Sequence, residues 1–242
     1  MDTRPSPALA ESIAAAQAWW REAGVDHTYR DEPQAWLAAE APEATVAKLE
    51  KPVEQPKPRL GGDPTNWPQD LAGFRQWWLE EPSLGPAPRI TPRGEAGAPV
   101  MMLVPMPEAE DRDTLLAGPQ GRLLASIATA MGIAPEAVYL ASALPSHMPE
   151  PDWQGLADDG LGEIVLHHIA LAAPQRLIVL GTRILPLLGH APAQAAPAVS
   201  ELAIQSGHMP LLTSYAPERL LGNARQRAGL WQCWLDWTGE GL

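Results

Sequence analysis

The sequence predicts an α/β protein, a three-layer α/β/α sandwich around a central, mostly parallel four-stranded sheet. Short continuous apolar runs at 100–104, 138–141, 176–181 and 209–213 are typical of strands that are buried on both faces. Segments with the apolar spacing of helices separate these runs, and such alternation favours parallel pairing through right-handed crossovers. Because ligands of such sheets bind at the carboxyl ends of the strands, the segments that follow the strands are the candidate sites.

The N-terminal part of the chain differs in composition from the rest. Apolar residues recur at helical spacing from Leu9 to Trp20, which predicts an amphipathic helix over residues 6–25. The segment that follows is rich in proline, and this composition favours extended backbone that buries little. We therefore expect a helical extension over residues 1–41, a proline-rich linker over 42–69 and an α/β domain over 70–242.

Helices are expected between the strands and after the last one. The helix expected over 70–81 carries Phe74 and Trp78 on one side and stops at Pro82. The helix expected over 120–131 ends at glycine, and the one over 161–173 ends at proline. Further helices are expected over 182–188, from 217 onward and over 223–237, and residues 201–205 are a candidate for an additional strand.

Composition and charge exclude several classes of protein. The chain has 17 basic and 29 acidic residues, a net charge of −12, which argues against a protein that coats nucleic acid but leaves room for a local basic cleft. A single cysteine, Cys233, excludes an internal disulfide and any metal or iron–sulfur site built from several thiolates. No apolar run reaches the roughly 18 residues of a membrane span, and the N-terminus lacks a signal-peptide pattern. We expect a cytoplasmic protein without a bound cofactor.

Paired histidines and acids also fail to predict a metal site. His167 and His168 are neighbours within a predicted helix, so their side chains point about 100° apart and cannot chelate one ion together. Asp158 and Asp159 are flanked by glycines, a pattern typical of the start of a helix. We interpret both pairs as structural.

Three loop segments, 104–112, 115–121 and 213–221, resemble in order and placement those of the uracil-DNA glycosylase superfamily, particularly its thermostable bacterial branch. The resemblance extends from about residue 99 to residue 237. It implies a uracil-DNA glycosylase-like fold and a link to bacterial DNA repair, in which such enzymes are hydrolases of the N-glycosidic bond.

The loop after the first strand departs from the family at its catalytic position. Pro107, Glu110 and Asp111 match the family pattern, whereas Pro105 stands where family members carry a glutamate that helps to activate the attacking water. Met106 lies beside it. The resemblance therefore implies that Pro105 is a degenerate catalytic position.

At the remaining pocket positions, a smaller side chain also replaces the residue that family members carry. Leu116 replaces a phenylalanine that stacks on the uracil, and Ser142 replaces an asparagine that reads the uracil edge. Ala216 replaces a histidine that stabilises the developing anion, so it is the second degenerate catalytic position. The resemblance implies that the substrate-binding positions are Met106, Pro107, Leu116, Gly118, Ser142 and Pro217.

Three hypotheses about function follow. The first is a pseudoenzyme: a glycosylase-fold protein that has lost base excision and acts as a binding or regulatory module. Single-stranded or damaged DNA is then a weak partner through a local cleft, to which the loop before the last helix supplies Arg219, Arg225 and Arg227. The second is a divergent DNA glycosylase, acting on uracil or another damaged base, in which Glu108, Glu110 or Asp111 orients water. In the third, the tryptophan-rich N-terminal helix binds a protein partner.

Overall fold

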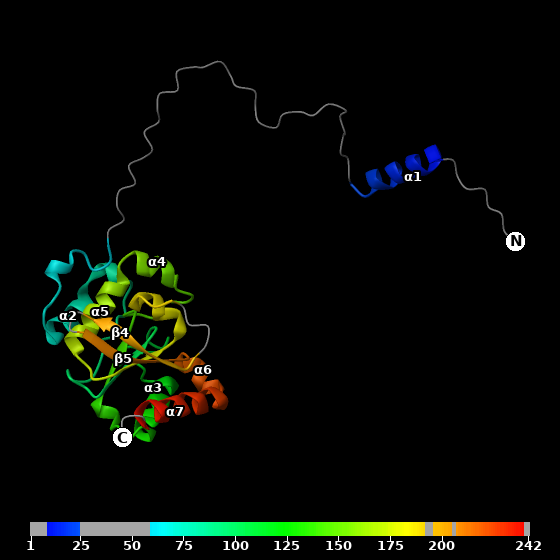
Figure 1. The fold of residues 1–242 in the computed structure, drawn as a ribbon. Helices are drawn as coiled ribbons and strands as arrows, with labels where there is room; N and C mark the ends of the chain where they lie inside the picture. Colours follow the sequence, from blue (N-terminus) through cyan, green and yellow to red (C-terminus); the bar gives the residue numbers. More distant parts are fainter. Residues whose placement is uncertain (1–8, 25–58, 192–195, 205–206, 240–242) are drawn as a thin grey trace, which may run out of the picture. The chain divides into compact units, whose positions relative to one another are not determined.

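The computed structural model describes residues 9–24, 59–191, 196–204 and 207–239, and Figure 1 traces the chain. The contacts between residues divide the chain into two units, residues 1–53 and residues 54–242. In the first unit, the predicted amphipathic helix is present as α1 (Leu9–Glu22), and none of its residues is buried. Residues 42–58 of the predicted linker lie outside the described residues.

The second unit contains a five-stranded, mostly parallel sheet with the strand order β2-β1-β3-β5-β4. Neighbouring strands are parallel except β4, which pairs antiparallel with β5. The strands are β1 (Val100–Val104), β2 (Val138–Ser142), β3 (Leu177–Leu180), β4 (Ala198–Ile204) and β5 (Gly207–Ser214).

The prediction of four strands is wrong, because β4 is a full member of the sheet at its edge. Only Leu202 of its seven residues is buried. A strand that is exposed along most of its length lacks the continuous apolar run that identified the central strands. The additional strand considered at 201–205 overlaps β4, which begins three residues earlier and ends at Ile204.

Helices cover both faces of the sheet (Figure 1). Met101, Leu103 and their neighbours pack on one side against α4 and α5, whereas Met102 and Val104 pack on the other against α3 and α7. Successive side chains of a buried strand point to opposite faces, which explains why each strand needs an unbroken apolar run. The helices of this unit are α2 (Leu71–Glu80), α3 (Pro119–Ala130), α4 (Trp153–Asp158), α5 (Leu161–Ala172), α6 (Pro217–Gly222) and α7 (Ala224–Gly239), and 182–188 forms the 3-10 helix η4 (Thr182–Leu188).

Residues 59–69, which the composition places in a linker, pack against the α/β unit. Trp67 is 5% exposed, and its ring lies 6.0 Å from that of Trp77 and 5.4 Å from that of His167. Its indole Nε1 donates a hydrogen bond of 2.7 Å to the carbonyl of Gly61. Proline content therefore does not mark the boundary of the packed unit.

Candidate functional site

The strand order creates a topological switch point between β1 and β3, the place where the connections that leave two neighbouring parallel strands run in opposite directions along the sheet. The chain runs from β1 to β2 on one side and then crosses to β3 on the other side of β1. The connections that leave β1 and β3 therefore diverge, which opens a crevice at the carboxyl ends of these strands. A cavity of about 380 Å³ lies there.

The cavity is lined by residues that follow the four parallel strands. Pro105 follows β1 directly, Gly181 follows β3, and Ala216 lies two residues after β5. The connection after β2 contributes the remaining wall. The full lining is Pro105, Met106, His147, Met148, Pro149, Glu150, Pro151, Trp153, Gly181, Thr182, Arg183, Tyr215, Ala216, Glu218 and Arg219.

The inner wall of the cavity is apolar and tightly packed. Gly181 has φ +142°, and a Cβ atom at this position would lie 2.8 Å from Cγ of Pro105 and 3.8 Å from Cβ of Ala216. Pro105 and Ala216, the positions at which the resemblance implies lost catalytic groups, therefore flank the same glycine. Neither side chain has a group that donates or accepts a proton.

Charged side chains lie at the mouth of the cavity. Arg183, Arg219, Glu150 and Glu218 are all exposed. The guanidinium of Arg219 lies 4.9 Å from the centre of the Tyr215 ring, a cation–π contact that positions it beside the opening. The site thus combines an apolar interior with two cations and two anions at its rim.

The carboxylates of the loop after β1 are engaged by backbone amides. Asp111 is 3% exposed and accepts hydrogen bonds from the N–H groups of Glu108 (2.9 Å), Leu116 (2.7 Å) and Ala117 (2.9 Å). Glu108 accepts from Gly118 (2.9 Å) and Gln120 (3.2 Å) at the start of α3. These contacts fix the loop.

Glu110, the third carboxylate of this loop, is exposed, and none of the three lines the cavity. The divergent-glycosylase hypothesis assigned the orientation of water to one of these three side chains. In the structure, Glu108 and Asp111 shape the backbone of the loop instead.

The structure brings three of the eight predicted site residues together in the cavity, namely Pro105, Met106 and Ala216. Ser142 is 2% exposed, and its hydroxyl donates a hydrogen bond of 2.6 Å to the carbonyl of Leu144. Leu116 is also 2% exposed and belongs to the core.

The other three positions lie outside the lining as well. Pro107 and Pro217 are buried, and the N–H group of Gly118 is bonded to Glu108. The wall that sequence reasoning missed is the segment from His147 to Trp153, which follows β2 and carries no motif. The sequence feature that could have identified this segment as part of the site is its position directly after a parallel strand.

A buried Tyr–His pair lies on the face of the sheet that α5 covers. The hydroxyl of Tyr139 is 2.7 Å from Nε2 of His168, whose ring stacks on Phe74 at 4.4 Å. Burial lowers the pKa of His168 to about 3, with smaller contributions from the charges of Arg75 and His167. Burial also raises the pKa of Tyr139 to about 12. Both groups are neutral at pH 7, which agrees with a structural role for His168.

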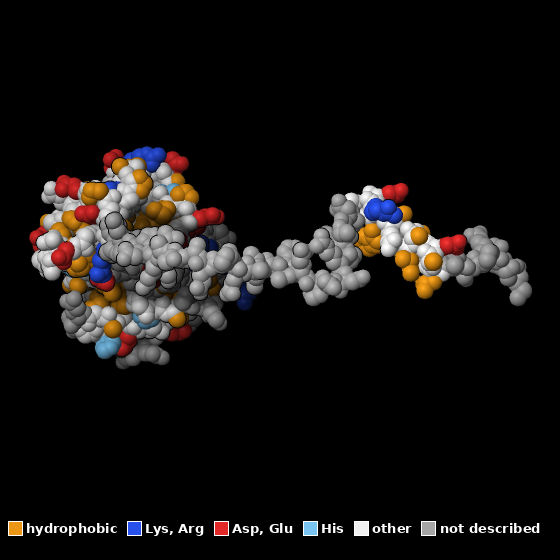
Figure 2. Space-filling view, turned by 90° about the horizontal axis from the view of Figure 1, so that it is seen from above, with side chains coloured by type: hydrophobic (Ala, Val, Ile, Leu, Met, Phe, Trp, Pro, Cys, Tyr) orange, Lys and Arg blue, Asp and Glu red, His pale blue; other side chains and the backbone are white. Residues whose placement is uncertain are grey.

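Among the described residues, no group of three or more histidine, cysteine, aspartate or glutamate side chains could hold a metal ion. In the same part of the chain, no helix is long and apolar enough to span a membrane. Figure 2 shows charged side chains of both signs scattered over the visible face of the α/β unit, without a broad basic area.

No protein-family model matches the chain, and no curated protein is similar to it. The function must therefore be inferred from the geometry of the site and from the residues that line it.

Proposed function

We propose that this protein is a binding or regulatory module with a uracil-DNA glycosylase-like domain that lacks base-excision activity and acts in DNA repair. The observation that supports this proposal most directly is the pair Pro105 and Ala216. Both line the cavity at the switch point, and both flank Gly181. They occupy the positions where the resemblance expects the groups that activate water and stabilise the uracil anion.

The expected loss of reaction rate favours a binding function over a catalytic one. Removing one electrostatic stabiliser from an active site typically lowers the rate by roughly 10²–10³-fold. Here two such groups are absent from one wall, and the carboxylates of the neighbouring loop are bonded to backbone amides. Such losses do not add simply, but together they remove most of the chemistry that glycosidic hydrolysis needs.

The same cavity has the properties of a site for a single nucleic-acid strand. Its apolar interior suits the face of a base, and Arg183 and Arg219 at its mouth suit two phosphates. Glu150 and Glu218 lie at the same rim and repel phosphate. Binding is therefore weak and strongly dependent on salt, as the acidic total charge also requires.

The loss of base excision is tested by a single-turnover assay. The full-length protein is incubated in excess over single-stranded DNA that contains one uracil, and free uracil is measured by mass spectrometry. We expect no uracil from the wild type or from Ala216→Trp, in which the indole fills the cavity. Uracil released by the wild type but not by Ala216→Trp would refute the proposal.

DNA binding is tested by fluorescence anisotropy with a labelled single strand. Arg183→Gln and Arg219→Gln should each weaken binding and lower its salt dependence, because each removes one phosphate contact. Arg122→Gln changes an exposed arginine of α3 that does not line the cavity, and it should leave binding unchanged. Equal effects of all three changes would contradict binding at the cavity.

We also infer that α1 contacts a protein partner. Within its unit, Trp19 and Trp20 are 61% and 51% exposed, and their rings touch edge to face at 5.0 Å. Exposed tryptophans are frequent anchors of protein interfaces. Deletion of residues 1–53 and the double change Trp19→Ala/Trp20→Ala should remove the same partners in a pull-down. Partners that depend on the deletion but not on the tryptophans would contradict this role for α1.

A further inference from the structure

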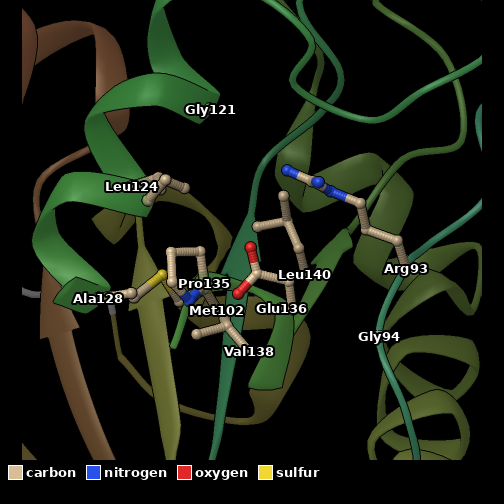
Figure 3. Close-up of a pocket in the computed structure, with 11 residues that line it drawn as sticks. Arg93, Gly94, Met102, Gly121, Leu124, Ala128, Pro135, Glu136, Val138 and Leu140 are labelled. Carbon is tan, nitrogen blue, oxygen red and sulfur yellow. The ribbon is translucent and has the colours of Figure 1, made fainter. Parts of the chain in front are cut away.

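A second cavity lies at the outer edge of the sheet, between α3 and β2 (Figure 3). It has a volume of about 300 Å³, and its lining shares no residue with that of the cavity at the switch point. Met102, Val138 and Leu140 form its floor, on the face of the sheet that α3 partly covers. Apart from Gly121, the lining lies outside the three loop segments that resemble those of the glycosylases.

The space exists because α3 presents small side chains to this part of the sheet. Gly121, Ala125 and Ala128 line the cavity at helical spacing. A Cβ atom on Gly121 would lie 1.8 Å from the carbonyl oxygen of Leu116, so no larger residue fits there. The small side chains of α3 thus leave space above the buried floor residues of β1 and β2.

The backbone holds Arg93 at one edge of this cavity. The N–H group of Arg93 donates to the carbonyl of Leu140 at 2.9 Å, and the N–H group of Leu140 donates back at 2.8 Å. The next residue, Gly94, has φ +116°, and a Cβ atom there would lie 2.7 Å from Cα of Tyr139. Residues 93–94 are therefore pressed against β2, which fixes the base of the Arg93 side chain.

Two opposite charges, both on exposed residues, face the apolar floor. Figure 3 shows the guanidinium of Arg93 and the carboxylate of Glu136 directed over the floor around Leu140. In the part of the chain that the structure describes, neither head group makes a hydrogen bond or an ion pair, with the other or with a third residue. A cation, an anion and an apolar surface thus converge on one space.

We propose that this cavity binds a free apolar α-amino acid. Its carboxylate pairs with Arg93, its ammonium group pairs with Glu136, and its side chain contacts Met102 and Leu140. Because both side chains are exposed, water solvates a charge that stays unpaired, and a ligand with a single charge forms one solvent-screened ion pair where an amino acid forms two. Either end of a peptide carries only one of these charges, so the geometry favours the free amino acid. The volume lies at the lower end of the range of small-molecule sites, about 300–1,000 Å³.

Isothermal titration calorimetry on the full-length protein tests the proposal. The ligands are L-phenylalanine, L-leucine and L-methionine, with N-acetyl-L-phenylalanine and L-phenylalaninamide as analogues that each lack one charge. We expect at least one amino acid to bind with a dissociation constant in the millimolar range or tighter. Both analogues should bind roughly two- to fivefold more weakly than phenylalanine, the loss of one exposed ion pair. Absence of saturable binding by all three amino acids, or equal binding of an analogue, would overturn the proposal.

Variants connect the binding to this cavity. Arg93→Gln and Glu136→Gln should each weaken binding roughly two- to fivefold. In Glu136→Gln, the advantage of phenylalanine over its N-acetyl analogue should disappear. Ala125→Leu fills the space and should abolish binding, whereas Arg122→Gln, on an exposed position of the same helix, should leave it unchanged. Circular dichroism shows whether each variant is folded, and normal binding by folded Ala125→Leu would exclude this site.

Discussion

The hydroxyl of Tyr139 lies 2.7 Å from Nε2 of His168, and this buried pair joins the sheet to α5. The imidazole of His168 is 1% exposed and stacks on Phe74. Protonating His168 inside this cluster places an uncompensated charge beside Arg75 and His167. The pair is therefore a point at which pH acts on the stability of the fold.

We predict that His168 makes the protein less stable as the pH falls below about 6.5. Burial lowers its pKa from 6.5 to about 3, so in this range the unfolded state binds a proton and the folded state does not. Stability is fully present above the unfolded pKa and is lost as the pH falls toward the folded pKa. The free energy of unfolding should decrease by at most about 1.4 kcal/mol per pH unit from this group.

Urea denaturation at several pH values between 7 and about 4 measures this dependence. His168→Gln should be less stable at pH 7 but should lose the part of the slope that His168 contributes. His208→Gln, on an exposed position of β5, is the matched control and should follow the wild type. Parallel curves for wild type and His168→Gln would show that His168 does not cause the pH dependence.

The next prediction concerns the wall of the cavity at the switch point. Gly181→Ala should destabilise the protein by about 1–3 kcal/mol, because φ of +142° is unfavourable for alanine and its Cβ would meet the ring of Pro105 at 2.8 Å. Gly222→Ala has nothing within 4 Å of the added carbon and should change stability little. Thermal unfolding of both variants measures the difference.

A double-mutant cycle separates the two causes. Pro105→Ala should recover part of the loss in Gly181→Ala, since it removes the clash and leaves the backbone strain. If the two changes simply add, Pro105 and Gly181 do not contact each other in the folded protein.

The central strands were predictable because burial on both faces requires a continuous apolar run within the sequence of each strand. Continuous apolar runs located β1 and β2 to within one residue, since both strands are buried along their whole length. The edge strand β4 lacks that pattern, and its membership in the sheet depends on pairing with β5. The expected helix over 182–188 is the 3-10 helix η4, which contains Pro186.

The candidate site was predictable in position but less so in its lining. Sequence order indicates which residues follow strands, but the position of β3 beside β1 decides which of them meet. Pro105 and Ala216 meet across Gly181 for this reason. Ser142 also lies at the carboxyl end of a parallel strand. Its hydroxyl, however, donates a hydrogen bond to the carbonyl of Leu144 in the following loop and does not line the cavity. No pattern in the sequence indicates this hydrogen bond.

Two buried serines at the carboxyl ends of β2 and β5 should respond differently to truncation. Ser142→Ala removes a hydrogen bond of 2.6 Å and leaves the carbonyl of Leu144 without this donor, so it should cost about 1–2 kcal/mol. The hydroxyl of Ser214 is buried without a hydrogen-bond partner among the described residues. Ser214→Ala removes an unsatisfied group and should be neutral or stabilising. Chemical denaturation of the two variants compares them directly, and equal losses would contradict the difference in bonding.

The last prediction concerns where the packed unit begins. Trp67→Ala should destabilise the α/β unit by about 3–5 kcal/mol, because it removes a large buried ring and the hydrogen bond to Gly61. Trp231→Ala is the matched control, since Trp231 is 39% exposed, and it should cost much less. Thermal unfolding of the two variants measures this difference.

Truncation tests the same boundary in another way. Deleting residues 1–53 should leave the melting temperature of the α/β unit unchanged, because these residues belong to the other unit. Deleting residues 1–69 removes Trp67 and also Leu60, whose N–H group donates to the carbonyl of Asp159 at 3.0 Å. The longer deletion should lower the melting temperature strongly or prevent folding. A unit that tolerates both deletions equally would place the boundary after Trp67, as the proline content alone suggests.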